Sequence, residues 1–214
     1  YLGSLVNVTS LQVRNTTITA DELKLIGSLP KLERLTLSNC GLSTISGLET
    51  ATGITYLDLS QNTIRDLTPL KSMTDLKEIN LQHNALNDLS VLGGLGSLSK
   101  LDVSYNLLST VSPLFKCKSL TSLNASNNTI TSLAGIGSLA GLESLKISNN
   151  TLSDIVPVSE CAKLKELDIS SNMISDITSL GALSHLESLI FARNTVIDLP
   201  EFAEDSALIT IDGS

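Results

Sequence analysis

The chain has 214 residues, of which 42% are hydrophobic and 17% charged, and its formal net charge is −8. A net negative charge argues against a nucleic-acid-binding surface, because proteins that contact phosphates carry a basic patch or stripe. No apolar run approaches the roughly 18 residues that span a bilayer, so we expect no membrane insertion. Trp is absent and only three Tyr and three Phe occur, which indicates a core of Leu, Ile and Val in one small packing unit used repeatedly.

The first such unit begins at Val8 and is 24 residues long. In its second half Thr19 is followed three residues later by Glu22, ahead of apolar residues. This pattern is a capping box and predicts a true α-helix. Leu2 and Leu5 fit the last apolar positions of a still earlier unit, so we expect the sequence to be a segment of a longer protein.

From Leu32 onward the unit is 22 residues long and returns without a slip. The ten units start at residues 8, 32, 54, 76, 98, 120, 142, 164, 186 and 208, and positions within a unit are numbered below from these starts. Self-similarity at a fixed period of this length is the signature of a solenoid, in which each unit packs on its neighbours. We therefore predict a single repeat domain over residues 1–214.

Each unit has two apolar patterns. Positions 4 and 6 are apolar between polar neighbours, which predicts a short strand at positions 4–6 with one buried face. Stacking of these strands makes a parallel sheet. Positions 14, 17 and 20 are also apolar, which suits a short 3₁₀ or helical return on the opposite side. Pro69, Pro113 and Pro157 share position 16, where each suits the first residue of a helical turn.

Position 9 is asparagine in seven consecutive units. A buried amide both donates and accepts hydrogen bonds, so stacked asparagines can satisfy the backbone where each strand bends into its loop. We predict a structural ladder at these positions. Its members are Asn62, Asn84, Asn106, Asn128, Asn150, Asn172 and Asn194.

The repeat resembles the leucine-rich-repeat family over essentially the whole chain. Its 22-residue length is similar to two subclasses, the bacterial internalins and the regulatory subunits of type-1 protein phosphatase. The returns at 66–70, 88–92 and 176–180 look more like those of internalins. The resemblance implies an α/β repeat solenoid: a right-handed horseshoe or arc with a concave parallel sheet and short 3₁₀ or helical convex returns. It also implies a protein partner on the concave face.

The outward side chains of the sheet are expected at positions 3, 5, 7 and 8. Position 7 is nearly always serine, and we expect these serines, Ser126 among them, to be exposed. Against this background units 3 to 5 carry larger and charged residues, and Tyr is a favoured interface anchor. The predicted partner-binding residues are Tyr56, Asp58, Glu78, Asn80, His83, Lys100, Asp102 and Tyr105.

These residues could instead be ordinary solvated strand residues, with Glu78 and Lys100 forming a modest cross-strand pair. A second, smaller candidate group is Ile190 with Met173 and Arg193. For that group, packing against a following domain is an equal alternative.

Two chemical interpretations of the sheet face fit the sequence poorly. His83, Asp102 and Ser104 superficially match a hydrolase triad, but an open sheet offers no oxyanion hole and no sheltered pocket. The column Asp58, Asn80 and Asp102 could offer oxygen ligands to Ca²⁺, but evenly spaced ligands on a ladder wrap an ion poorly. We therefore expect no enzyme activity, no cofactor and no metal.

Cys117 and Cys161 both occupy position 20, two units apart, and Cys40 occupies the asparagine position. Strands two apart place Cα atoms roughly 9–10 Å from each other, beyond the reach of about 7 Å for a disulfide. Three buried free thiols are predicted. Free thiols favour a reducing, cytoplasmic compartment, whereas the internalin resemblance implies a bacterial cell surface, and the two remain open.

Two functions follow from the sequence. The first is a monomeric module that binds a protein partner on its concave face. The alternative is a structural spacer, or the repeat arm of a larger multidomain protein, with no partner on this segment.

Overall fold

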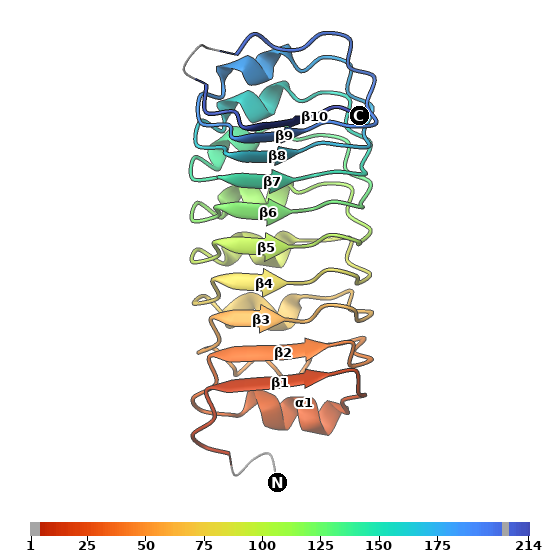
Figure 1. Ribbon diagram of the computed structural model, residues 1–214. Coiled ribbons are helices and arrows are strands. Elements are labelled where there is room, and N and C mark those ends of the chain that lie inside the picture. The colour runs from red at the N-terminus through yellow and green to blue at the C-terminus, as the bar shows by residue number, and fades with distance from the viewer. Residues whose placement is uncertain (1–4, 203–205) are drawn as a thin grey trace.

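The computed structural model describes residues 5–202 and 206–214. Leu2, which the sequence assigns to a unit before the first strand, lies outside the described residues. Ten strands form one sheet, all parallel, in the same order as in the sequence (Figure 1). The sheet does not close on itself, and β1 and β10 form its two edges. The predicted solenoid of sequentially stacked strands is confirmed.

The strands are β1 (Ser10–Arg14), β2 (Arg34–Ser38), β3 (Tyr56–Asp58), β4 (Glu78–Asn80), β5 (Lys100–Asp102), β6 (Ser122–Asn124), β7 (Ser144–Lys146), β8 (Glu166–Asp168), β9 (Ser188–Ile190) and β10 (Thr210–Asp212). The 3₁₀ helices are η2 (Thr68–Ser72), η3 (Ser90–Gly94), η4 (Ser112–Lys116), η5 (Ile136–Ser138), η6 (Val156–Glu160) and η7 (Thr178–Ala182). One α-helix, α1, spans Ala20–Gly27. No helix in these described ranges has the length and apolar character needed to cross a membrane.

The strands begin one residue earlier than predicted. They occupy positions 3–5 in β3 to β10 and positions 3–7 in β1 and β2, rather than positions 4–6. The reason lies in the backbone pairing. In unit 3 the N–H groups of Thr55 and Tyr56 both donate to the carbonyl of Glu33, at 2.8 and 3.2 Å. The ladder between units is therefore already formed at positions 2 and 3.

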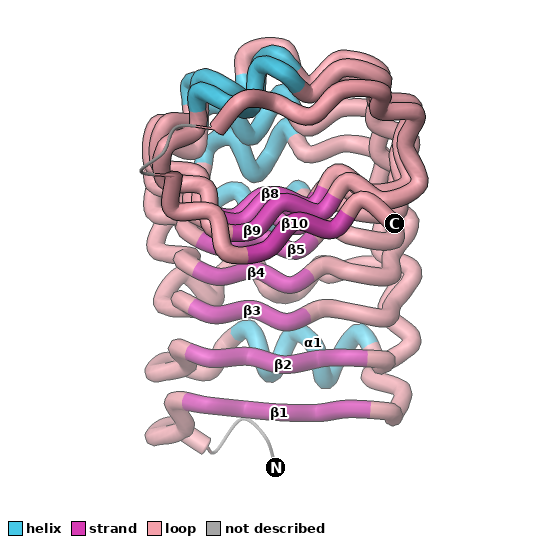
Figure 2. The backbone as a smooth tube through the Cα atoms, turned by 45° about the horizontal axis from the view of Figure 1, so that its top comes forward, coloured by secondary structure: helices cyan, strands magenta, loops and turns pink. Residues whose placement is uncertain are grey.

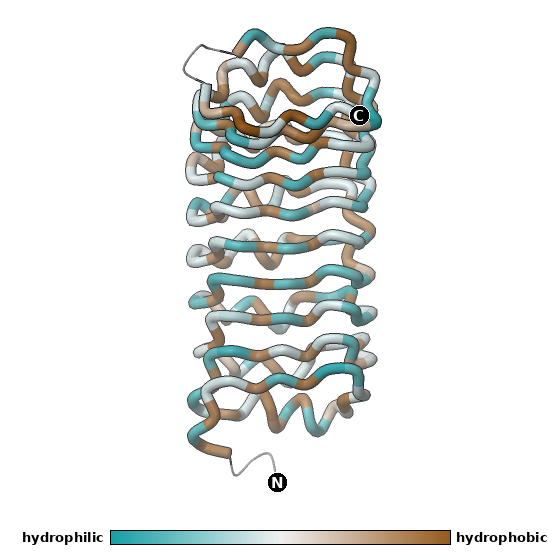
Figure 3. Tube along the Cα trace, in the orientation of Figure 1, coloured by the Kyte–Doolittle hydropathy of each residue, from teal (hydrophilic) through white to brown (hydrophobic). Residues whose placement is uncertain are grey.

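The returns lie on the side of the solenoid opposite the strands (Figure 2). In unit 3 the three apolar positions of the return, Leu67, Leu70 and Met73, are all buried. They meet the inward side chains of the sheet in a single continuous core that runs through the stack. Hydrophobic and hydrophilic residues alternate along the strands (Figure 3), which leaves one sheet face for the core and one for solvent. Each prolyl residue at position 16 is the second residue of its 3₁₀ helix, one later than expected.

The helix α1 begins with the predicted capping box. The Glu22 N–H donates to Thr19 Oγ1 at 3.3 Å, and the Thr19 N–H donates to the Glu22 carboxylate at 2.9 Å. These reciprocal bonds satisfy two backbone donors that a helix start otherwise leaves free. The first unit is two residues longer than the others, and it carries an α-helix where later units carry a 3₁₀ turn.

The asparagines at position 9 bond to the backbone of two units each. In the middle of the stack, the Leu108 N–H donates to Asn128 Oδ1 at 3.0 Å. Asn128 Nδ2 lies 3.1 Å from the Val103 carbonyl of the preceding unit and 3.0 Å from the Ala125 carbonyl of its own. The other six asparagines repeat this arrangement. Each amide therefore joins adjacent units at the point where a strand ends.

Position 8 has a left-handed backbone in every unit from the first to the ninth. The φ angles lie between 52° and 58°, a region that non-glycine residues enter rarely and Asn and Asp most readily. Four of the nine positions are asparagine, which was the available sequence signal. This turn directs position 9 into the ladder. The nine residues are Asn15, Asn39, Gln61, His83, Tyr105, Asn127, Asn149, Ser171 and Arg193.

The three cysteines are free and buried. The Cys117 thiol donates to the Leu92 carbonyl at 3.2 Å, and Cys161 lies 3.7 Å from the Ile136 carbonyl. Burial, with a smaller contribution from the charge of Glu160, raises the pKa of the Cys161 thiol to about 11. Burial also raises the pKa of Cys40 and Cys117. Because the thiolate is the reactive form, a raised pKa makes all three thiols poorly reactive in the folded state.

We expect all three cysteines to resist a thiol reagent in the native protein and to react once denaturant is added. Mass spectrometry after alkylation in denaturant, without reductant, should find three modified cysteines. An intrachain disulfide, or fast labelling of Cys117 or Cys161 in buffer, would contradict the stacking described here.

Candidate functional site

The outward face of the sheet carries a shallow hollow of about 410 Å³ that extends from β3 to β8. Its walls are mainly the side chains at positions 3 and 5. Five of the eight predicted partner-binding residues line it together: Tyr56, Glu78, Asn80, Lys100 and Asp102. The hollow continues three strands beyond the predicted group. The additional polar residues are Ser122, Asn124, Ser144, Lys146 and Glu166.

Asp58 does not line the hollow. Only 7% of its surface is exposed, and its Oδ1 accepts the Ser60 N–H at 3.0 Å. Its assignment as an exposed contact residue is therefore corrected. The carboxylate is held against its own strand end, where it satisfies a backbone donor.

The same turn recurs along position 5 and makes this part of the face rigid. Asp102 Oδ1 accepts the Ser104 N–H at 2.9 Å and the Ser104 hydroxyl at 2.6 Å. Its other oxygen accepts Asn124 Nδ2 at 2.9 Å, and Asn80 Oδ1 accepts the Gln82 N–H at 3.1 Å. These hydrogen bonds hold the polar side chains of Asp102 and Asn80 in place on the sheet face.

The same hydrogen bonds bear on the hydrolase triad considered for His83, Asp102 and Ser104. The Ser104 hydroxyl bonds to Asp102, while the His83 ring stacks on Tyr105, so Ser104 and His83 do not form the nucleophile–base pair that a triad requires. Within residues 5–202 and 206–214, no three His, Cys, Asp or Glu side chains are grouped closely enough to hold a metal ion.

The serines at position 7 are less exposed than expected. Ser126 is only 7% exposed, and its hydroxyl accepts the Ser148 hydroxyl at 3.0 Å. Ser60 and Ser104 are buried as well. Small hydroxyls at this position bond across strands or to position 5, and they pack beside the left-handed turn instead of pointing into solvent.

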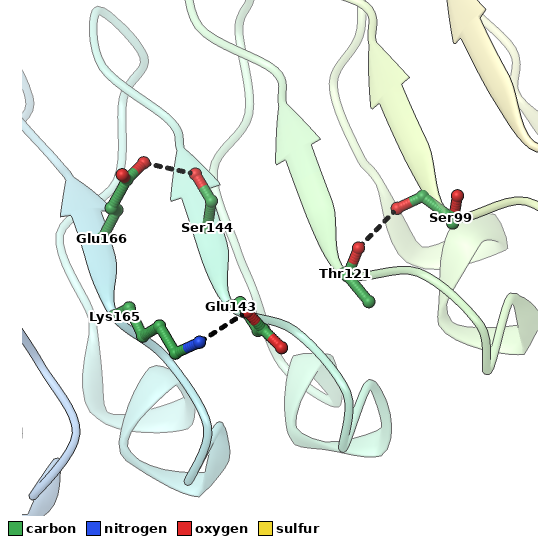
Figure 4. Close-up of polar contacts among 6 residues, drawn as sticks. All are labelled: Ser99, Thr121, Glu143, Ser144, Lys165 and Glu166. Atoms are coloured by element: carbon green, nitrogen blue, oxygen red, sulfur yellow. Dashed lines mark hydrogen bonds and ion pairs between the residues drawn. The ribbon is translucent and has the colours of Figure 1, made fainter.

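Within the described part of the chain, two ion pairs join adjacent units. Glu78 and Lys100 lie 3.4 Å apart, and their side chains are 41% and 60% exposed, so the pair contributes at most about 1 kcal/mol. Lys165 lies 2.8 Å from Glu143; its hydrogen bond and charge lower the pKa of Glu143. Figure 4 shows this second pair beside the bond from the Ser144 hydroxyl to Glu166, 3.0 Å long. In the same view Thr121 donates to the Ser99 carbonyl.

Two aromatic contacts flank the hollow. The Arg34 guanidinium lies 4.0 Å from the centroid of the Tyr56 ring. His83 and Tyr105 lie outside the hollow, at position 8, with ring centroids 4.1 Å apart and ring planes 12° apart. Of the predicted partner-binding residues, only Asp58, His83 and Tyr105 are therefore not part of the hollow.

The second predicted group lies toward the C-terminal end. Ile190 lines a smaller hollow of about 240 Å³ with Lys146, Glu166 and Asp168, and this hollow shares two residues with the larger one. Met173 is 56% exposed. Ile190 therefore belongs to the sheet face, whereas Met173 and Arg193 do not line either hollow.

Comparison with known proteins agrees with this architecture. A family model described as "Leucine Rich repeats (2 copies)" matches residues 52–94, 118–161 and 141–182. Internalin C2 of Listeria monocytogenes is similar in structure, with 31% identity and a TM-score of 0.81, covering 92% of this chain and 84% of that one. A comparison with curated protein sequences finds no match.

More distant structures share the fold. The functional domain of InlJ from Listeria monocytogenes has 22% identity and a TM-score of 0.76, covering 99% of this chain and 50% of that one. The plant peptide hormone receptor RGFR1, solved in complex with RGF2, has 20% identity and a TM-score of 0.71, covering 90% and 37%. The fold and the family match define a leucine-rich-repeat solenoid, of the protein-interaction class in general. The chain belongs to the leucine-rich-repeat family and within it resembles the internalins.

Proposed function

We propose that this chain is a protein-recognition module that contacts its partner through the hollow on the outward sheet face, from β3 to β8. The observation that carries the proposal is the row of pre-bonded polar side chains along positions 3 and 5. Because these groups are already ordered, a partner does not have to supply the free energy of ordering them.

The chemistry of the hollow favours a protein surface as the ligand. Glu78, Asp102 and Glu166 alternate with Lys100 and Lys146 along the face, a mixed pattern that complements another folded surface. Tyr56, held by Arg34, supplies the aromatic anchor that interfaces favour. Lys146 is exposed and makes no ion pair with any described residue, which leaves it free for a carboxylate of the partner.

The proposed activity is binding without catalysis, by a monomer. The hollow is shallow and open along six strands, so it does not enclose a substrate away from water, which enzymes do to strengthen their electrostatic interactions. Light scattering in solution tests the monomer directly, and a mass of two chains would contradict it.

The binding proposal is tested with two matched variants as baits. In the hollow variant, Tyr56, Glu78 and Lys100 are each replaced by serine, the residue that four other units carry at position 3. In the control, Lys71→Ala and Lys116→Ala remove charges on η2 and η4, on the opposite side. Proteins captured by the wild type are identified by quantitative mass spectrometry, and their affinities for all three baits are measured.

We expect the hollow variant to bind the captured partner at least about tenfold more weakly, because interface anchors contribute 2 kcal/mol or more. The control should bind as the wild type does. Equal binding by the hollow variant and the wild type would show that the hollow is not the binding site. Capture of no partner at all would support the structural-spacer alternative.

A further inference from the structure

A second surface feature lies at the edge where the strands turn into their loops. His83 and Tyr105 stack there in adjacent units, and Leu107 follows two residues after Tyr105. Tyr105 is 48% exposed and Leu107 61% exposed. These three residues, called the edge patch below, are not part of the hollow.

Comparison of the units indicates that the fold does not require the three side chains of the edge patch. Position 8 is left-handed in all nine units, and asparagine, which tolerates this conformation, fills it in four of them. Position 10 is threonine in five of the nine units, whereas Leu107 places an apolar side chain in solvent. Histidine enters the left-handed region more readily than most residues, but tyrosine does not, and strain of the kind expected at Tyr105 concentrates at functional sites. Folding alone would favour Asn at 105 and Thr at 107.

The charges of the loops that carry the edge patch, together with its exposed rings, favour a planar, positively charged group as the ligand. Asp88 is exposed, five residues after His83 in the chain, and hydrogen bonds from the Ser90 hydroxyl and N–H lower the pKa of its carboxyl. Positions 7–13 of units 3 to 5 carry two aspartates, Asp66 and Asp88, against one arginine, Arg65, and the whole chain carries a net charge of −8. A guanidinium is planar and charged, so it can stack on an aromatic ring and pair with a carboxylate. The chain already makes one such contact, between Arg34 and Tyr56.

We propose that the edge patch is a docking surface for a basic segment of the protein partner, anchored by an arginine that stacks on the His83–Tyr105 pair while an apolar neighbour contacts Leu107. This inference rests on the proposed function, since it requires a protein partner. It adds a contact outside the hollow and states the chemistry of the segment that makes it.

The test uses an edge variant with His83→Asn, Tyr105→Asn and Leu107→Thr, which places at all three positions residues that other units carry there. The matched control, Met173→Thr with Arg193→Asn, makes the same kinds of change at positions 10 and 8 of units 8 and 9. A random library of 12-residue peptides displayed on phage is selected on the whole wild-type chain. The strongest binders are synthesised, and their Kd values are measured by fluorescence anisotropy.

We expect the selected peptides to contain arginine and to bind the edge variant at least about tenfold more weakly than the wild type or the control. Replacing the peptide arginine by lysine should weaken binding several-fold, because lysine lacks the planar group. The edge variant should melt no lower than the wild type, which shows that it remains folded.

Peptides that bind the edge variant as tightly as the wild type would overturn the inference, as would peptides without arginine or a selection that yields no binder. The hollow variant separates the two proposals. Peptides that depend on the hollow and not on the edge patch would overturn only this inference, whereas peptides that depend on neither would count against both.

Discussion

Replacing Leu145 with alanine is expected to lower the free energy of unfolding by about 2–5 kcal/mol, the range for truncating a fully buried leucine. Leu145 is the central residue of β7 and has 0% exposure. It lies in register between Leu123 of β6 and Leu167 of β8. The cavity would therefore be shared by three units, whose short strands leave little freedom to collapse around it.

Urea unfolding followed by circular dichroism measures this loss. Leu107→Ala is the matched control: it makes the same chemical change at a side chain that is 61% exposed, so its effect should stay within about 0.5 kcal/mol. If the two variants unfold at the same urea concentration, the continuous core described here is wrong. Because the units contact only their neighbours, a second transition in Leu145→Ala would report separate unfolding of the two halves.

Asn128→Ala is expected to destabilise the chain by about 1–3 kcal/mol, the penalty for leaving a buried polar group unpaired. The substitution removes the acceptor of the Leu108 N–H and the donor shared by the Val103 and Ala125 carbonyls. Asn128 is half-buried, so water can replace its hydrogen bonds only in part. We therefore expect the melting temperature of Asn128→Ala to be lower than that of the wild type.

The control for Asn128→Ala is Thr131→Ala, at an exposed position. Ser126→Ala, which the sequence favours as an exposed control, is unsuitable because Ser126 is buried and bonded to Ser148. Equal melting temperatures for Asn128→Ala and Thr131→Ala would show that the asparagine ladder does not stabilise the stack.

The fold could be predicted from the sequence because its core follows a strict spacing. Stacking of 22-residue units buries positions 4, 6, 14, 17 and 20 together, and the observed core contains these positions together with positions 1 and 11. The strand limits were missed by one residue because backbone bonds such as that from Thr55 to Glu33 begin the ladder at a polar position. Hydrophobic patterns do not record bonds of this kind.

The outward face was predicted less completely. Positions 3 and 5 were correctly assigned to the sheet surface, but Asp58 is only 7% exposed and is bonded to the Ser60 N–H, which no side-chain pattern reveals. Lys146 and Glu166 interrupt columns of small polar residues and could have been selected on that ground. The left-handed turn at position 8 had only the recurring asparagines as a signal, and His83 and Tyr105 conceal it.

Across the described residues, each strand contacts only the strands of the adjoining units. Distances along the solenoid therefore change in steps of one strand spacing, about 4.8 Å. Each 22-residue unit adds one strand to its length, whereas the two extra residues of the first unit are accommodated in the return that carries α1, and β1 still pairs in register with β2. Loss of residues 120–141 would bring Tyr105 beside Asn149 and shorten the distance from Lys100 to Lys146 by one strand spacing. Gain or loss of a block thus resets the spacing between recognition groups while the surface of each remaining unit keeps its own structure.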